Sequence, residues 1–171
     1  TFRGKRGVLD VVAGRPPRNV NALNGVTLEL KRGETLGVVG ESGCGKSTLA
    51  RCIVRLHEPG GGDILFHGSD VFAPDQRRDR SYNRRVQMMF QDPYSSLNPR
   101  MTTGQILKEA LIVHGMCGEA EVPERLQELM DLVQLPHDAL EKYSHEFSGG
   151  QRQRIAIART MVLKPELVVL D

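Results

Sequence analysis

The nine residues from position 40 to position 48 constrain the fold more than any other segment. The first eight of them, residues 40–47, follow the pattern G-x-x-x-x-G-K-[ST] without a mismatch. A strand-like apolar run precedes them at 35–39, and a helix-like run follows at 48–56. Glycines between a strand and a helix aim backbone N–H groups inward, beside the positive end of the helix dipole. The pattern thus predicts a phosphate-binding loop (P-loop), in a chain that binds a nucleoside triphosphate or derives from one that did. Its residues are Gly40, Glu41, Ser42, Gly43, Cys44, Gly45, Lys46, Ser47 and Thr48.

Two side chains of this loop have predicted roles. Lys46 supplies a point charge for the β- and γ-phosphates, and Ser47 offers its hydroxyl to Mg²⁺. The alternative is a glycine-rich turn that carries an incidental lysine. The strand and helix patterns on either side favour the phosphate-binding interpretation.

Composition places the chain among ordinary soluble globular proteins. It has 171 residues, an apolar share of 39%, a charged share of 26% and a net charge of +2, so charge alone gives no argument for nucleic acid. The odd number of cysteines, three, argues against a disulfide framework and favours a reducing cytoplasm. We find no signal peptide and no membrane-spanning run, and the absence of an initiator Met suggests a fragment.

Hydrophobic periodicity predicts a β-rich, antiparallel first part around one helix, followed by helices and a last strand. That last strand, a continuous apolar run, is expected to be covered on both faces. The expected strands lie at 8–12, 26–30, 35–39, 64–66, 86–90 and 167–170, and the expected helical stripes are 106–114, 126–133 and 148–162.

Asp171 follows the apolar run at 167–170. A buried strand can deliver a carboxylate to the Mg²⁺ beside a γ-phosphate. Apolar strands often end in Asp at a turn, so the pattern gains weight only from the P-loop upstream.

Two consecutive glycines, Gly149 and Gly150, follow Phe147 and Ser148. Gln151 stands three residues after Ser148, the spacing of a helix capping box, and an ordinary helix cap is the alternative interpretation. The segment of Phe147, Ser148, Gly149, Gly150 and Gln151 closely resembles the signature of the ATP-binding cassette (ABC) family, Leu-Ser-Gly-Gly-Gln, and differs only at the first position. A Ser hydroxyl and two Gly amides at a helix start can form a second phosphate site.

The resemblance extends from about Asn21 to Asp171. Residues 90–102 look like the Q-loop of ATPase subunits from peptide and nickel importers. The resemblance implies that Gln91 reaches Mg²⁺ and the attacking water, so that Lys46 and Gln91 are catalytic and Mg²⁺ is held by Ser47, Gln91 and Asp171. The cofactors it implies are ATP and Mg²⁺.

The resemblance also implies partners and a location. In the family two ATPase subunits form a head-to-tail dimer, and each signature covers the γ-phosphate held by its partner's P-loop. The helices between 104 and 135 would face two membrane permease subunits, at the cytoplasmic face of the bacterial inner membrane. The implied function is ATP-driven import of peptides or a similar small solute. Two rivals are a soluble ABC ATPase acting on nucleic acid or ribosomes, which usually has paired cassettes or coiled-coil insertions, and a non-catalytic nucleotide-binding fragment.

The sequence departs from the family in three ways. The Glu that follows the Walker B aspartate Asp171 is absent, and so is the switch His. We therefore expect the 171-residue chain to be deficient in hydrolysis. No aromatic residue stands at 16–19 to stack on adenine, and Arg15 or Arg18 could replace it by a cation–π contact.

The fold class that the resemblance implies is α/β, an ABC-type P-loop NTPase with an antiparallel β subdomain and a helical subdomain, lacking its C-terminal part. We expect a β-rich and P-loop region at 1–92, the Q-loop and helical subdomain at 93–147, and the signature helix and Walker B strand at 148–171. Without the strand that bears the switch His, the runs 35–39 and 167–170 would lie roughly 9.6 Å apart, too far to pair. The isolated chain would then be marginally stable and prone to associate.

Overall fold

The computed structural model describes every residue except 1, 4–18, 21, 77–78 and 92–96. The chain forms two compact units, Thr1–Arg77 and Arg78–Asp171, and each is considered by itself. The strand expected at 8–12 and the candidate adenine contacts Arg15 and Arg18 lie outside the described residues.

The described part of the first unit contains one α-helix and two small antiparallel pairs of strands. Helix α2 (Lys46–Ile53) follows the P-loop directly, as the sequence predicts. Strand β1 (Phe2–Arg3) pairs with β2 (Asn19–Val20), and β3 (Leu65–Phe66) pairs with β4 (Ser69–Asp70). The β3–β4 turn has positive φ at its two central residues, as a two-residue hairpin turn requires.

Two strands expected in this unit do not form. The runs at 26–30 and 35–39 belong to no ladder among the described residues, and all of their residues are exposed. Val39 is 96% exposed. The prediction was wrong here because alternating or continuous apolar residues only make a strand when another strand supplies hydrogen-bond partners.

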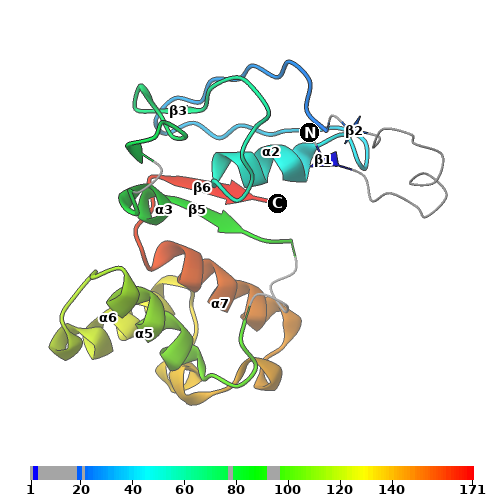
Figure 1. The fold of residues 1–171 in the computed structure, drawn as a ribbon. Helices are drawn as coiled ribbons and strands as arrows, with labels where there is room; N and C mark the ends of the chain where they lie inside the picture. Colours follow the sequence, from blue (N-terminus) through cyan, green and yellow to red (C-terminus); the bar gives the residue numbers. More distant parts are fainter. Residues whose placement is uncertain (1, 4–18, 21, 77–78, 92–96) are drawn as a thin grey trace, which may run out of the picture. The chain divides into compact units, whose positions relative to one another are not determined.

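The second unit holds the longer helices and a parallel pair of strands (Figure 1). The three helical stripes predicted from the sequence are confirmed, and Pro123 lies in the first turn of the second of these helices, α6. The elements in chain order are α3 (Ser81–Arg85), β5 (Val86–Met89), α5 (Thr103–Val113), α6 (Val122–Leu132), α7 (Gly149–Met161) and β6 (Leu167–Leu170), with 3₁₀ turns at Glu119–Glu121, His137–Glu141 and Ser144–Glu146.

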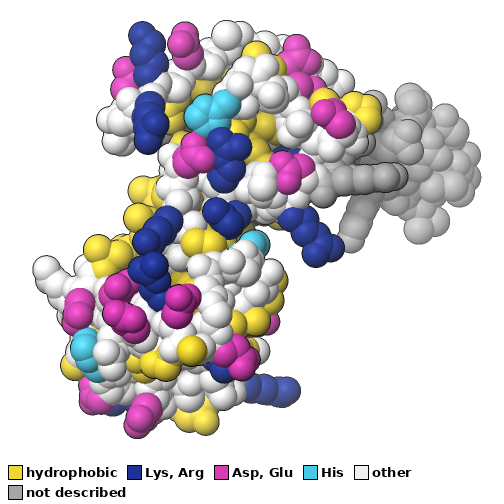
Figure 2. All heavy atoms as spheres, turned by 90° about the vertical axis from the view of Figure 1, so that its left-hand side faces the viewer, with side chains coloured by type: hydrophobic (Ala, Val, Ile, Leu, Met, Phe, Trp, Pro, Cys, Tyr) yellow, Lys and Arg dark blue, Asp and Glu magenta, His cyan; other side chains and the backbone are white. Residues whose placement is uncertain are grey.

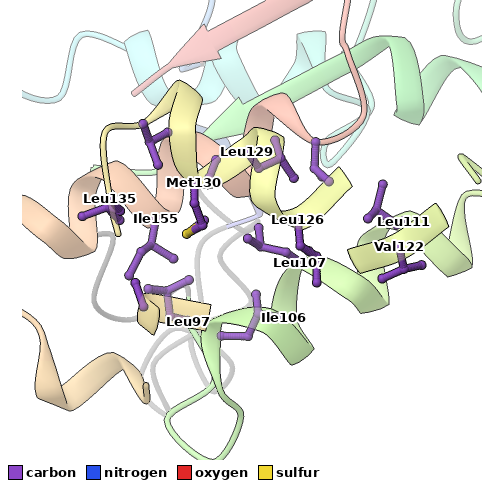
Figure 3. Packing of buried hydrophobic residues seen from close by; sticks show 14 of the residues in the cluster. Leu97, Ile106, Leu107, Leu111, Val122, Leu126, Leu129, Met130, Leu135 and Ile155 are labelled. Carbon is purple, nitrogen blue, oxygen red and sulfur yellow. The ribbon is translucent and has the colours of Figure 1, made fainter. Parts of the chain in front are cut away.

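The hydrophobic core of this unit lies between α5, α6 and α7. Leu107, Met130 and Ile155, one from each helix, are completely buried. Side chains of all three helices point toward one another in Figure 3. The helices are thus positioned by their apolar faces, which fixes where the first turn of α7 lies within the unit. The other core residues are Leu97, Ile106, Leu111, Val122, Leu126, Leu129, Val133, Leu135, Ala139, Phe147, Ala158, Val162 and Leu163.

Strands β5 and β6 run parallel, with Val86 opposite Leu167 and Met89 opposite Leu170. The expectation of a last strand covered on both faces was wrong. Residues Leu167 to Val169 are only partly buried, and Leu170 is 73% exposed. The physical reason is that the described sheet has only two strands, so β6 is an edge strand and lacks a neighbouring strand on one side.

The surface carries charges of both signs. In Figure 2, Lys and Arg side chains lie among Asp and Glu side chains over the visible face, with apolar groups between them. This mixture agrees with the small net charge of +2.

Candidate functional site

The P-loop curls around the ammonium group of its own lysine. Lys46 Nζ donates hydrogen bonds to the carbonyl oxygens of Gly40 at 2.6 Å and Glu41 at 2.7 Å. Cys44 Sγ lies 3.5 Å from the same nitrogen, and the Cys44 N–H donates to the Glu41 carbonyl at 3.3 Å. The lysine ammonium group is therefore held against its own loop by backbone acceptors.

Gly45 lets the loop turn directly into α2. It is the N-cap of the helix, with φ 104° and ψ 4°, a conformation that side chains other than Gly rarely adopt. A Cβ atom there would lie 2.3 Å from the carbonyl oxygen of Ala22. The N-cap offers no side-chain acceptor, and the first turn of α2 contains no acidic residue. This helix start is thus suited to an external anion.

Gln91 and Asp171 lie just beyond the carboxyl ends of two neighbouring strands. β5 and β6 are parallel, so their carboxyl ends meet at one edge of the sheet. The Asp171 N–H donates to the Met89 carbonyl at 3.1 Å, which extends the ladder by one bond. Both residues are exposed. An amide oxygen and a carboxylate at one edge are the hard oxygen donors that Mg²⁺ prefers.

Strand β6 is also tied to β5 at its opposite end. Glu166 accepts a hydrogen bond from Arg85 Nε at 2.6 Å, and the Glu166 N–H donates to the Arg85 carbonyl at 2.8 Å. The side-chain hydrogen bond that Arg85 donates to Glu166 raises the pKa of Arg85. The register that places Asp171 beside β5 is therefore held at both ends of the pair.

Ser148 caps α7 as the sequence predicts. Its N–H donates to Gln151 Oε1 at 3.0 Å, and the Gln151 N–H donates to Ser148 Oγ at 3.4 Å. The buried Phe147 anchors the cap in the core. Gly149 and Gly150 are exposed, and a Cβ on either would meet nothing within 4 Å. Two glycines without local crowding leave the backbone of this first turn accessible to a large ligand.

Two residues beside the signature escaped the sequence analysis. Gln134 and Arg154 line a cavity of about 360 Å³ together with Ser148 and Gly150. Pro136 indicates in the sequence that α6 ends nearby. The hydrogen bond from Arg154 to the Gln134 carbonyl cannot be predicted from the residue types. Periodicity alone could not have found this pair.

The described residues were also searched for metal-binding groups and for membrane-spanning helices. They contain no group of three or more His, Cys, Asp or Glu side chains that could hold a metal ion. No helix within the described part of the chain is long and apolar enough to cross a membrane.

The fold and its motifs define a P-loop nucleoside triphosphatase domain. The chain belongs to the ABC transporter family, which matches residues 23–171. It is 49% identical over 154 residues to the oligopeptide transport ATP-binding protein AppF of Bacillus subtilis, covering 90% of this chain and 47% of AppF. The chain thus spans about half the length of the curated relatives it matches.

Solved structures agree with this family. CbiO1 of Clostridium perfringens, part of the ABC transporter complex CbiONQ, matches with a TM-score of 0.74 and 28% identity, over 88% of this chain and 58% of CbiO1. The ATP-binding cassette MJ0796, solved as a dimer in a post-hydrolysis state with ADP and Pi, matches with a TM-score of 0.72 and 27% identity, over 88% of this chain and 65% of MJ0796. The expected fold class is confirmed, although two of its strands are not formed here.

Proposed function

We propose that this chain is the nucleotide-binding part of an ABC ATPase that couples ATP binding and hydrolysis to import of peptides or a similar small solute. The observation that carries the proposal is that one chain has two glycine-rich helix starts, one at the P-loop with Gly45 before α2 and one at the signature with Ser148 before α7. AppF, which is 49% identical, is an oligopeptide transport ATP-binding protein. We divide the chain by role into a P-loop region at 1–92, a Q-loop and helical region at 93–147 and a signature and Walker B region at 148–171.

The P-loop binds the triphosphate of ATP in this proposal. Lys46 exchanges the carbonyls of Gly40 and Glu41 for β- and γ-phosphate oxygens, which are stronger acceptors because they are charged. The N–H groups of the loop and of the first turn of α2 surround the phosphates, and Ser47 offers a hydroxyl to the metal.

Gln91 and Asp171 are the residues of the second unit to which this proposal gives a role in holding Mg²⁺. Their positions at one edge of the β5–β6 pair support this role, and both provide oxygen ligands. A bound Mg²⁺ neutralises charge on the phosphate oxygens. A single carboxylate suffices, because Mg²⁺ is typically held by one or two carboxylates together with substrate phosphates. Gln91 also orients the attacking water.

The signature acts on the nucleotide of a second ATPase subunit. Ser148 keeps its hydroxyl at the helix start, and the open backbone at Gly149 and Gly150 allows another chain's phosphate to approach closely. The cassette MJ0796, which was solved as a dimer, supports an association of two ATPase subunits, and we propose that it is head-to-tail. The Gln151 side chain serves the capping box and so holds this first turn rigid.

The helical region docks on membrane permease subunits at the cytoplasmic face of the bacterial inner membrane. A hollow of about 570 Å³ along α5 supports this location. Met101, Ile112 and Val113 supply apolar surface there, and Lys108 and Glu109 supply charge. Val113 is 72% exposed, so α5 presents apolar area that a partner helix could cover.

The test uses the complete gene product that carries these residues, purified with and without its permeases. We expect Mg²⁺-dependent phosphate release that Lys46→Ala abolishes and that the permeases change. The matched control is Lys31→Ala, which replaces an exposed lysine of the same unit outside the loop. Adding RNA or DNA tests the alternative function. Sustained turnover in Lys46→Ala would contradict the proposal, and stimulation by nucleic acid alone would favour the soluble ABC ATPase.

A further inference from the structure

The cavity beside the signature has two walls of different origin. One wall is the first turn of α7, with Ser148 and Gly150. The other is the turn that ends α6, from Gln134 to Pro136. Neither wall alone would enclose a ligand, so the shape of the cavity depends on what holds the α6 turn against α7.

The backbone of the α6 turn is in an unfavourable conformation. Gln134 has φ 55°, in the left-handed region where Gly is preferred. Its N–H donates to the Asp131 carbonyl at 3.1 Å, and the next residue, the buried Leu135, donates to the Met130 carbonyl at 3.0 Å. These bonds close the end of the helix, and neither of them uses the Gln134 carbonyl.

That carbonyl accepts a hydrogen bond from Arg154. The distance from Arg154 Nη1 to the Gln134 oxygen is 3.1 Å. Arg154 lies four residues after Gly150, so the two residues share one face of α7. A guanidinium–carbonyl bond is charge-assisted and therefore stronger than a neutral one. It connects the two walls of the cavity directly.

We propose that Arg154 is a positioning residue that holds the Gln134 turn as the second wall of the signature pocket, so that Gln134 contacts the nucleoside triphosphate presented by a second ATPase subunit. This inference rests on the proposed function. It adds a contact outside the signature itself, made by the end of α6. Arg154 acts through the turn, and Gln134 touches the ligand.

Steady-state ATP hydrolysis by the complete gene product tests the proposal. Arg154→Met keeps the aliphatic stem and removes the bond, and we expect kcat to fall about tenfold with KM for ATP changed by less than about twofold. Gln134→Gly removes the side chain at a position where Gly suits the backbone, so the protein should remain folded, and kcat should fall by a similar factor. Gln134→Asn keeps an amide and tolerates the left-handed region, so it should retain more activity than Gln134→Gly.

The double variant supplies the decisive readout. If Arg154 acts through Gln134, the combined variant should be no slower than either single variant, because the same contact is already lost. A purely structural role would instead lower the melting temperature of Arg154→Met together with its activity. Multiplicative effects of the two substitutions, or an unchanged kcat in Arg154→Met, would overturn the proposal.

Ser148→Arg separates this inference from the proposed function. If Ser148→Arg hydrolyses ATP normally, the signature role itself fails. If Ser148→Arg is inactive and Arg154→Met is normal, the signature stands and only the positioning role of Arg154 is wrong.

Discussion

The two units of this chain differ in how far their apolar residues are buried. In Arg78–Asp171, side chains from α5, α6 and α7 form one continuous core. In the described part of Thr1–Arg77, the buried apolar residues are Ala50, Cys52 and Val71, whereas apolar residues at 26–30 and 35–39 are exposed. A helix satisfies its backbone internally and only needs its apolar face covered. A strand needs a partner before its side chains can be buried.

The largest difference between the two units is expected when one buried and one exposed leucine are each replaced by alanine. Leu107 is completely buried and Leu36 is 47% exposed. We expect Leu107→Ala to lower the free energy of unfolding by about 2–5 kcal/mol, because it leaves a cavity in the core. Leu36→Ala should change it by about 0.5 kcal/mol or less. Urea unfolding of both variants checks this, and equal destabilisation would mean that residues 35–39 are packed in solution.

Alanine substitutions at two glycines, one at the start of α2 and one at the start of α7, compare the backbones of the two units. Gly45→Ala places a Cβ 2.3 Å from the Ala22 carbonyl at φ 104° and should destabilise the first unit by roughly 1–3 kcal/mol. Gly150→Ala meets nothing within 4 Å inside a helix and should stabilise by up to about 1 kcal/mol. Thermal unfolding measures both. If Gly150→Ala destabilised as strongly as Gly45→Ala, the signature backbone would not be open.

Cysteine labelling compares exposed and buried positions within the first unit. Cys44 is exposed in the P-loop, whereas Cys52 is buried, and burial raises the pKa of the Cys52 thiol. The thiolate is the reactive form. We therefore expect a maleimide to label Cys44 first, and Cys52 only at higher pH or after unfolding. Mass mapping of the labelled peptides identifies the site, and protection of Cys44 by ATP would add support for the P-loop role. Preferential labelling of Cys52 would contradict the described packing.

The smallest expected effect concerns an exposed ion pair in the second unit. Lys142 Nζ lies 2.7 Å from Asp138 Oδ2, and this hydrogen bond lowers the pKa of Asp138. A carboxylate with a lowered pKa stabilises the fold above its unfolded pKa, and that contribution is lost as the pH falls through the folded pKa. Asp138→Asn should therefore lower the melting temperature slightly at about pH 7 and not at about pH 2. An effect of equal size at about pH 2 would mean that Asp138 acts through something other than its charge, and would contradict the role assigned to this ion pair.

The sequence predicted local features well and pairing poorly. The capping box of Ser148 and the buried stripe of α6 follow from residue spacing alone, because both involve residues three or four positions apart. The P-loop is equally local. The strands at 26–30 and 35–39 depend on distant partners, which periodicity does not supply. Gln134 was missed because its role depends on its backbone conformation and on Arg154, and not on its residue type.

The different roles of the P-loop and the signature are tested most directly by the affinity for ATP of two variants of the complete gene product. This affinity is measured by calorimetry under conditions that prevent hydrolysis. We assign the P-loop to the chain's own nucleotide and the signature to the nucleotide of a second subunit. Lys46→Ala should therefore weaken binding at least about thirtyfold, through the loss of about 2–5 kcal/mol from an unpaired phosphate charge. Ser148→Arg should bind ATP within about twofold of the parent, because its effect is confined to the dimer. Equal loss of affinity in both variants, or unchanged affinity in Lys46→Ala, would contradict this division of roles between the two units.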